Sequence, residues 1–106
     1  MIRTEVLVGR NIPGGGEVSD SAWNEFVASY VTPRFPEGLT MIDGNGQWRN
    51  AAGVVERERG KILLLTHGDD AASQRKVDEV AVEYKRRFKQ EAVMRIRTPV
   101  CVHFDD

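Results

Sequence analysis

The stretch LTMIDGNGQWRNAAGVVERERGKILLLT, residues 39–66, contains two extended segments joined by a short turn. Leu39–Ile42 predicts the start of a strand, which is interrupted at Gly44-Asn45-Gly46 and resumes through Trp48. Ala51-Ala52-Gly53 is typical of a hairpin turn. The returning strand is predicted in two parts, Val54–Glu58 and Lys61–Thr66, with Arg59-Gly60 between them as a kink or a bulge. A long hairpin in the middle of the chain indicates an antiparallel sheet.

A helical pattern lies on each side of this hairpin. Before it, Ser19 is expected to cap a helix that ends at Pro33. The apolar residues of that helix recur at helical spacing and are Trp23, Phe26, Val27, Tyr30 and Val31. After the hairpin, Asp69 or Asp70 is expected to cap a second helix. Its apolar stripe is Val77, Val80, Ala81, Tyr84 and Phe88.

The two ends of the chain supply the outer strands. Ile2–Arg10 alternates as a strand does, and Ala92–Arg97 with Val100–Phe104 predicts a last strand that Thr98-Pro99 breaks. With right-handed crossovers, the order of elements predicts an α+β, ferredoxin-like βαββαβ sandwich as a single domain over residues 1–106. Its antiparallel sheet would have the strand order four, one, three, two, with both helices on one face.

The second face of this sheet is expected to be covered as well. Ile62-Leu63-Leu64-Leu65 is apolar on both sides of its strand, whereas an antiparallel strand with one wet face alternates. Leu7 is expected to join Leu63 and Leu65 on the open face. The simplest cover is a second copy of the chain, so we expect a homodimer through this face. The alternative is a monomer with a modest apolar patch.

Composition narrows the classes of partner. The chain is 41% hydrophobic and 29% charged, with a formal net charge of -1, so no overall field favours nucleic acid. No segment is long and apolar enough for a membrane span. Cys101 is the only cysteine, which excludes an intrachain disulfide and fits a cytoplasmic location. We expect no nucleic-acid partner, no membrane, no cofactor and no metal.

One end of the predicted sheet gathers a first set of candidate ligand-binding residues. Arg10 and Arg49 are expected there beside the Gly14-Gly15-Gly16 loop, where they would pair with a carboxylate or phosphate. Trp48 would stack on a planar ligand. The alternative is a solvated network of these arginines with Glu56 or Glu58.

The other end gathers Arg34, His67 and the pattern H-x-D-D, which starts at His67 and recurs at His103. Arg34 is expected either to bind an acidic ligand or to bond the last carbonyls of the first helix. His67 is a candidate general acid or base, and the alternative is a histidine that merely ends a strand. Capping and a mobile terminus explain the aspartates of the two patterns better than a metal does.

Two further residues carry predictions of their own. Asp43, before Gly44-Asn45-Gly46, is a candidate catalytic base if a pocket raises its pKa, and otherwise it forms a turn. Cys101 is expected in an apolar strand as an inert core residue.

Three segments resemble a known family: Gly9–Gly16, Val31–Gly38 (V-T-P-R-F-P-E-G) and Asp43–Arg49 (D-G-N-G-Q-W-R). They are similar to a bacterial family of small proteins classed only as a domain of unknown function, and the likeness extends over nearly the whole chain. The resemblance implies no activity. Many members of that family carry an export signal, a pattern that the start of this chain does not show.

Together these residues favour a protein that binds an acidic small molecule. If that molecule is planar, Trp48 would stack on it. If the protein is an enzyme, a cofactor-free isomerase or lyase fits the residue types best. The alternative is a noncatalytic interaction or regulatory module that uses the open face of its sheet.

Overall fold

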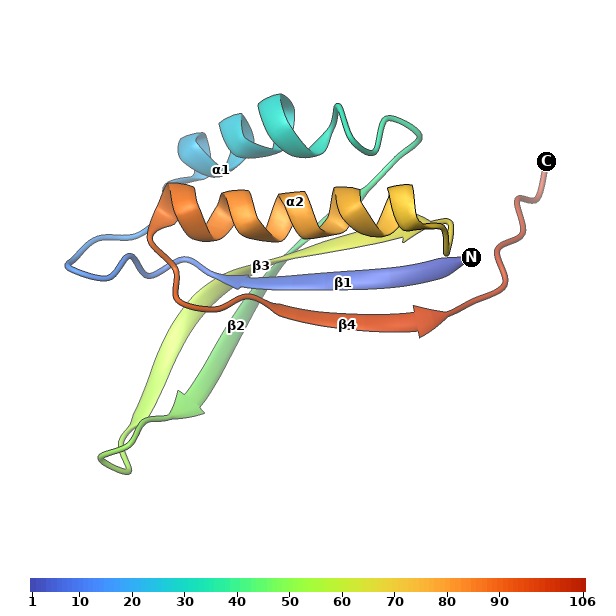
Figure 1. The fold of residues 1–106 in the computed structure, drawn as a ribbon. Coiled ribbons are helices and arrows are strands. Elements are labelled where there is room, and N and C mark those ends of the chain that lie inside the picture. Colours follow the sequence, from blue (N-terminus) through green and yellow to red (C-terminus); the bar gives the residue numbers. More distant parts are fainter.

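The computed structural model describes residues 1–106, and its elements follow the predicted order. They are β1 (Ile2–Gly9), α1 (Asp20–Phe26), the π-helical segment η1 (Val27–Val31), β2 (Thr40–Arg49), β3 (Val55–His67), α2 (Ala71–Phe88) and β4 (Met94–Pro99). All strand pairs are antiparallel, in the order β2-β3-β1-β4. Figure 1 shows both helices on one face of this sheet. The predicted ferredoxin-like α+β fold is confirmed.

Local sequence signals account for where the helices begin. The Ser19 hydroxyl accepts a hydrogen bond from Ala22 N at 3.0 Å, as expected of an N-cap. Of the two aspartates proposed as cap of the second helix, Asp70 is the one that accepts from Ser73 N, at 3.1 Å. Hydrogen bonds to Ser73 hold the pKa of Asp70 below its usual value.

The core lies between the helices and one face of the sheet. Every second residue of β1 faces it, and β3 contributes Leu63 and Leu65, both fully buried. An aromatic cluster joins the helices to each other: Tyr84 lies 4.8 Å from Phe88 and 5.5 Å from Phe26, measured between ring centroids. Tilted and edge-on aromatic pairs of this kind stabilise a core beyond the area that they bury.

Leu63 and Leu65 were expected on the open face of the sheet. They lie on the helix side instead, so this expectation was wrong. Their neighbours Ile62 and Leu64 lie on the open face instead, opposite Leu7 and Glu5 of β1. The prediction that this strand is apolar on both sides is confirmed. The error was in which residues face which side, because a shift of one residue exchanges the two faces of a strand.

The last strand is shorter than expected. It ends at Pro99, and Val100–Phe104 forms no strand, because the chain has by then passed the start of β1 and has no strand to pair with. Val100 N still donates to Met1 O at 3.0 Å, which is the last bond of this ladder. Cys101 is exposed, so the prediction of a core cysteine was wrong.

The β2–β3 hairpin extends well beyond the rest of the sheet. The turn is the one predicted: Gly53 N donates to Asn50 O at 3.0 Å, and Gly53 has the positive φ of 81° that favours glycine. β1 stops opposite Gly60, so residues 45–59 form a two-stranded arm that curves away from the helices (Figure 1). Each residue of β3 around Gly60 pairs with one residue of β2. Of the two alternatives predicted at Arg59-Gly60, this excludes the bulge and leaves the kink.

Glu83 supplies a pH-dependent part of the stability of α2. Its carboxylate accepts hydrogen bonds from Arg86 at 2.6 Å and from Arg87 at 3.0 Å, which lowers its pKa to about 2. The ordinary value is 4.5, so this contribution is present above pH 4.5 and is lost as the pH falls from there toward 2.

We expect Glu83→Gln to be less stable than the parent chain at neutral pH, with the difference closing between pH 4.5 and 2. Chemical denaturation across that range measures it. A difference that stays constant down to pH 2 would contradict this assignment. Glu79→Gln serves as the control, because Glu79 also lies on α2 and its carboxylate pairs with Arg34.

Candidate functional site

Three glycines stand side by side across the sheet where the arm begins. Gly9 of β1 pairs with Gly60 of β3, which in turn pairs with Gly44 of β2. Gly46 follows two residues later on β2, on the same face. Glycine weakens a strand interior, so its presence there marks a bend or a close approach of another group.

Packing requires Gly60 and leaves Gly44 and Gly46 unexplained. A Cβ at Gly60 would lie 2.9 Å from the backbone atom Val8 O, whereas one at Gly9 would lie 2.4 Å from a carboxylate oxygen of Glu58, at the end of a side chain that can move. At Gly44 and Gly46 the nearest atoms would be 3.7 Å away, which is an ordinary contact. The bare backbone at Gly44 and Gly46 therefore leaves open space on the sheet instead of relieving a clash.

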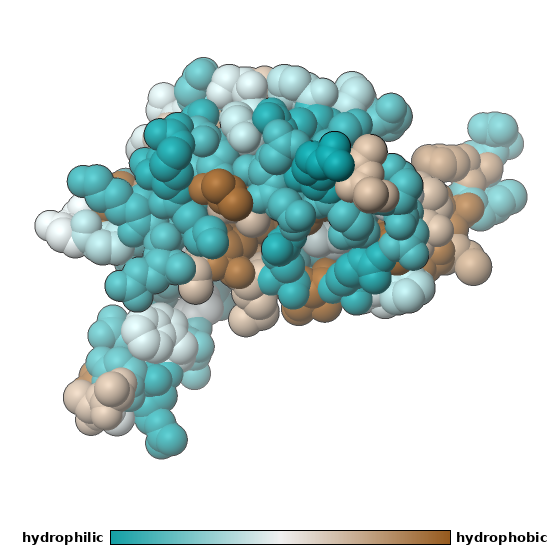
Figure 2. Space-filling view, in the orientation of Figure 1, coloured by the Kyte–Doolittle hydropathy of each residue, from teal (hydrophilic) through white to brown (hydrophobic).

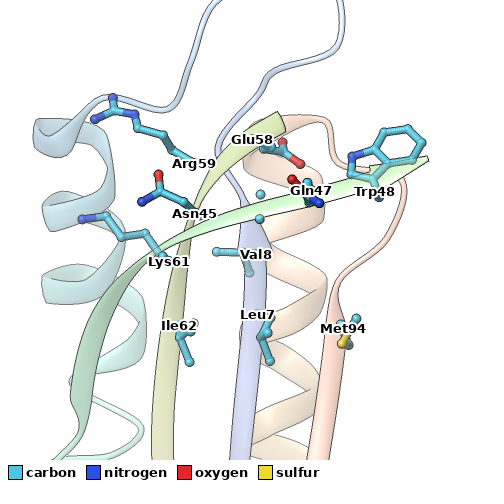
Figure 3. Close-up of a pocket in the computed structure, with 14 residues that line it drawn as sticks. Leu7, Val8, Asn45, Gln47, Trp48, Glu58, Arg59, Lys61, Ile62 and Met94 are labelled. Carbon is cyan, nitrogen blue, oxygen red and sulfur yellow. The ribbon is translucent and has the colours of Figure 1, made fainter. Parts of the chain in front are cut away.

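This space is a hollow of about 380 Å³, which we call the trough. Its lining residues come from all four strands: Leu7, Val8, Gly9, Gly44, Asn45, Gly46, Gln47, Trp48, Glu58, Arg59, Gly60, Lys61, Ile62 and Met94. Figure 3 shows Leu7, Ile62 and Met94 below the bent β2 strand, with Glu58, Gln47 and Trp48 above them. The trough thus combines an apolar floor with a polar and aromatic upper wall.

Trp48 offers a flat surface at the rim. Its side chain is exposed, whereas the only other tryptophan, Trp23, is buried in the core. An exposed indole on a hairpin gains nothing from the hydrophobic core, so its position beside a hollow is the feature that points to a ligand.

The charged groups of the trough are already paired. Glu58 accepts a hydrogen bond from Asn11 N at 3.0 Å. Arg59 makes two hydrogen bonds with Glu17, at 2.6 and 3.0 Å, and these hold the pKa of Glu17 below its usual value. Lys61 donates to Asp43 at 2.5 Å. Neither cation is left free to attract an anion.

Asp43 does not meet the condition set for a catalytic base. Its side chain is exposed, and the hydrogen bond from Lys61 lowers its pKa below the ordinary value instead of raising it. A carboxylate with a lowered pKa is a weaker base. The condition for a catalytic role is therefore not met, and Asp43 is the partner of a nearly buried lysine.

Arg10 and Arg49, which were expected to lie together, are separated. Arg10 is buried on the helix side, where it donates to Val18 O at 2.7 and 2.9 Å and to Asp20 at 3.1 Å. Arg49 is exposed at the far end of β2, and successive residues of a strand point to opposite faces, so it lies on the other side from Trp48. The predicted gathering of both arginines around one ligand at this end was wrong.

The other end of the sheet does bring two candidates together. A second hollow of about 270 Å³, here called the lower cavity, is lined by Met1, Arg34, Phe35, Glu37, Gly38, Thr66, His67, Gly68, Ser73 and Lys76. His67 is buried, and both its ring nitrogens are occupied, by Thr4 Oγ1 at 2.7 Å and Gly68 O at 2.8 Å. In the neutral ring, Nδ1 donates to Gly68 O and Nε2 accepts from the threonine.

Arg34 binds the protein rather than an open site. It donates to Tyr30 O at 3.0 Å, which confirms the expectation that it bonds a carbonyl at the end of the first helix. It also pairs with Glu79 at 3.0 Å and stacks on the Tyr30 ring, with 3.7 Å between Cζ and the ring centroid. The two candidate residues of the lower cavity, Arg34 and His67, are therefore both held by contacts within the protein.

The two H-x-D-D patterns lie in different settings, because His67 is buried and His103 is exposed in the C-terminal segment. The structure shows no group of three or more histidine, cysteine or acidic side chains placed to hold a metal ion. None of its helices has the length and apolar character needed to cross a bilayer.

Sequence reasoning missed most of the trough. Trp48 was the one predicted residue that lines it, and Glu58 was considered only as a surface partner. The available signal was the pair of interruptions at Gly44-Asn45-Gly46 and Arg59-Gly60. Aligning the hairpin around its turn places these glycines opposite each other, and the register with β1 adds Gly9.

Known structures share this fold. A phage SAM lyase in complex with S-methyl-5'-thioadenosine superposes with a TM-score of 0.71 at 15% identity, covering 92% of this chain and 79% of that chain. Phage SAM lyase in the apo state gives a TM-score of 0.68 at 17% identity, covering 92% and 78%. At these identities the likeness concerns the fold alone.

No curated protein matches the chain in sequence. A family match is nevertheless clear and covers nearly the whole length, which confirms the resemblance noted from the sequence. Residues 3–104 match the family described as "Protein of unknown function (DUF3574)", and the chain belongs to that family.

Proposed function

We propose that this protein binds a small molecule with a planar ring in the trough. The observation that carries the proposal is the pair of glycines, Gly44 and Gly46, that packing does not require, next to an exposed Trp48. A bare backbone lets a flat ring approach closely, and the indole can stack on its other side. The apolar floor of Leu7, Ile62 and Met94 would take the less polar part of the ligand.

The polar groups of the trough favour a ring that carries hydrogen-bonding groups. The Glu58 carboxylate lies on the same face of the sheet as Gly46 and Trp48, and it accepts hydrogen bonds. The acidic character expected of the ligand gains no support within one copy of the chain, because Arg59 and Lys61 are both paired with acids.

The fold likeness suggests the first probes. The phage SAM lyase structure holds S-methyl-5'-thioadenosine, which combines a flat purine with an apolar thioether. A purine nucleoside of this kind matches the shape and chemistry proposed for the trough. Because the likeness rests on fold, it guides the choice of probe and assigns no substrate.

Any reaction in the trough would depend on Glu58. A cofactor-free isomerase or lyase needs a group that moves a proton, and Glu58 is the only carboxylic acid that lines the trough. The other predicted candidates, Asp43 and His67, do not line it. Binding is therefore the primary proposal, and proton transfer by Glu58 is its extension.

Intrinsic tryptophan fluorescence tests the proposal directly, because the chain has only two tryptophans, the exposed Trp48 and the buried Trp23. We expect adenosine, S-methyl-5'-thioadenosine or a compound from a planar-ring library to quench Trp48 and to raise the melting temperature. Trp48→Ala should weaken binding of the best compound by about 5- to 150-fold, the value of one stacking contact.

Two variants make this result specific. Trp48→Phe keeps an aromatic surface and should retain most of the affinity, whereas Val54→Ala changes an exposed apolar side chain of the arm that does not line the trough. Equal affinity in Trp48→Ala and the parent chain would refute the trough as the binding site. The absence of any binding compound in the library would refute the proposal itself.

A second candidate function is an interaction module. The open face carries exposed apolar side chains, including Ile42, Met94 and Ile96. Figure 2 shows apolar surface along the lower edge of the body, beside the projecting arm. Contiguous apolar surface of this kind marks protein interfaces, so a protein partner on this face would account for it without any small molecule.

A further inference from the structure

The open face has an apolar centre on two neighbouring levels of the sheet. On one level Leu7 of β1 lies between Ile62 of β3 and Met94 of β4. On the level before it, Glu5 lies between Leu64 and Ile96. The centre of this patch is therefore next to Val6 on β1, halfway between the two levels.

Opposite charges lie at equal distances on either side of this centre. Arg3 is three residues before Val6, on the open face, and it enters none of the ion pairs of the chain. Gly9 is three residues after Val6, and the Glu58 carboxylate occupies the space next to it. The face thus has a cation at one end, an anion at the other and, between them, apolar groups that surround Glu5.

We infer that a second copy of the chain stacks on this face with its β1 antiparallel to the first. The two-fold axis lies between the two sheets, perpendicular to their β1 strands, and passes over Val6 of each copy. It brings Arg3 of each copy opposite Gly9 and Glu58 of the other, because an isologous interface matches each patch with its own image. It also places the Leu64 and Ile96 level of one copy on the Ile62 and Met94 level of the other.

A second copy also fits the shape of the arm. A two-stranded ribbon with exposed apolar residues is marginally stable alone, and this one curves toward the side that the second copy occupies (Figure 1). Antiparallel stacking directs each arm toward the far end of the other sheet. The arm therefore gains a surface to pack against that a single copy does not supply.

This arrangement completes the trough, and this part of the inference rests on the proposed function. The trough opens on the face that the second copy covers, and Arg3 of that copy arrives beside Glu58. It contributes the unpaired cation that one copy lacks, so the completed site takes a planar ligand that carries an acidic group. The dimer itself does not depend on a ligand.

Sedimentation equilibrium tests the association. We expect the parent chain to be a dimer and Ile96→Glu to be a monomer, because the substitution places a second carboxylate next to Glu5 in the centre of the face. Val82→Glu is the control: Val82 is 59% exposed on α2, more than the 43% of Ile96, but lies away from the open face, so this variant should remain dimeric. Circular dichroism confirms that each variant is folded.

A charge exchange tests the register. Arg3→Glu and Glu58→Arg should each weaken self-association at least tenfold, because each places like charges opposite each other twice. A mixture of the two variants restores both Arg–Glu contacts and should form heterodimers. A parent chain that stays monomeric at high concentration would overturn the inference, as would a dimer that withstands Ile96→Glu. Heterodimers no tighter than either variant alone would overturn the register.

The experiments distinguish a failure of the ligand proposal from a failure of the dimer proposal. If the trough proposal is wrong, the parent chain still sediments as a dimer and Trp48 shows no quenching. If the dimer is wrong, the mass is that of one chain whatever Trp48 reports. Tighter binding of the acidic members of the planar-ring library to the parent chain than to Arg3→Gln supports the contribution of Arg3.

Discussion

Gly60→Ala is expected to lower the free energy of unfolding by about 1–3 kcal/mol, the usual cost of forcing extra volume into a packed site. The added Cβ would lie 2.9 Å from the backbone atom Val8 O. The backbones of the two paired strands fix both atoms, so neither can rotate away. The chain must instead separate β1 from β3 at the point where the arm leaves the sheet. Chemical denaturation at neutral pH measures the loss.

Gly46→Ala is the matched control for this substitution. It adds the same methyl group to a glycine of the same trough, but the nearest atom, Glu58 O, would lie 3.7 Å away. Stability should then change by less than about 0.5 kcal/mol. Equal losses in Gly60→Ala and Gly46→Ala would contradict this explanation, because only Gly60 has a backbone atom within 3 Å of the added Cβ.

Trp23→Ala is expected to cost about 3–5 kcal/mol of stability, the range for removing a fully buried aromatic side chain. Trp23 is 1% exposed and lies 5.8 Å from Phe26 and 6.1 Å from Tyr84, measured between ring centroids. It also packs beneath Lys61, whose ammonium lies 5.8 Å from the indole centroid. Its loss would leave a cavity at the centre of the core.

The other tryptophan provides the comparison. Trp48→Ala removes the same side chain from an exposed position on the arm, so it should change stability by less than about 0.5 kcal/mol in the absence of ligand. Denaturation of both variants separates a core tryptophan from a binding one. A large loss of stability in Trp48→Ala would mean that this indole is a structural residue, which would weaken the proposed function.

The fold was predictable because local signals and topology agreed. The Ser19 cap, the apolar stripes of both helices and the Gly53 turn all lie where the pattern placed them. The strand order then followed from the handedness of the crossovers. Val100–Phe104 was mispredicted because its alternating pattern favours a strand locally, whereas a strand also needs a neighbour to pair with.

The site was less predictable because it depends on register. Trp48 was identified from its residue type, but the trough arises only where Gly9, Gly60 and Gly44 meet across three strands. A one-residue error in either pairing would scatter them. Arg10 illustrates the opposite failure: its type favours ligand binding, yet its guanidinium is buried and bonds the carbonyl oxygen of Val18.

Asp43 shows why a pattern does not determine a pKa. The sequence places it before a turn-like Gly-Asn-Gly segment, and nothing local indicates Lys61, which lies 18 residues later on the paired strand. That lysine lowers the pKa of the carboxyl instead of leaving it to a pocket. Contacts between strands, and not spacing along the chain, decided the chemistry of this residue.

The most direct test of the trough uses the glycine amide signals in a ¹H–¹⁵N correlation spectrum. The chain has ten glycines, and they report on every relevant region. Gly9, Gly44, Gly46 and Gly60 line the trough, and Gly38 and Gly68 line the lower cavity. The remaining four, Gly14, Gly15, Gly16 and Gly53, lie in loops away from both.

Titration with the tightest compound from the planar-ring library should shift the signals of the four trough glycines and leave the other six in place. Shifts confined to Gly38 and Gly68 would assign binding to the lower cavity and contradict the account. Ten unchanged signals at saturating compound would contradict it as well.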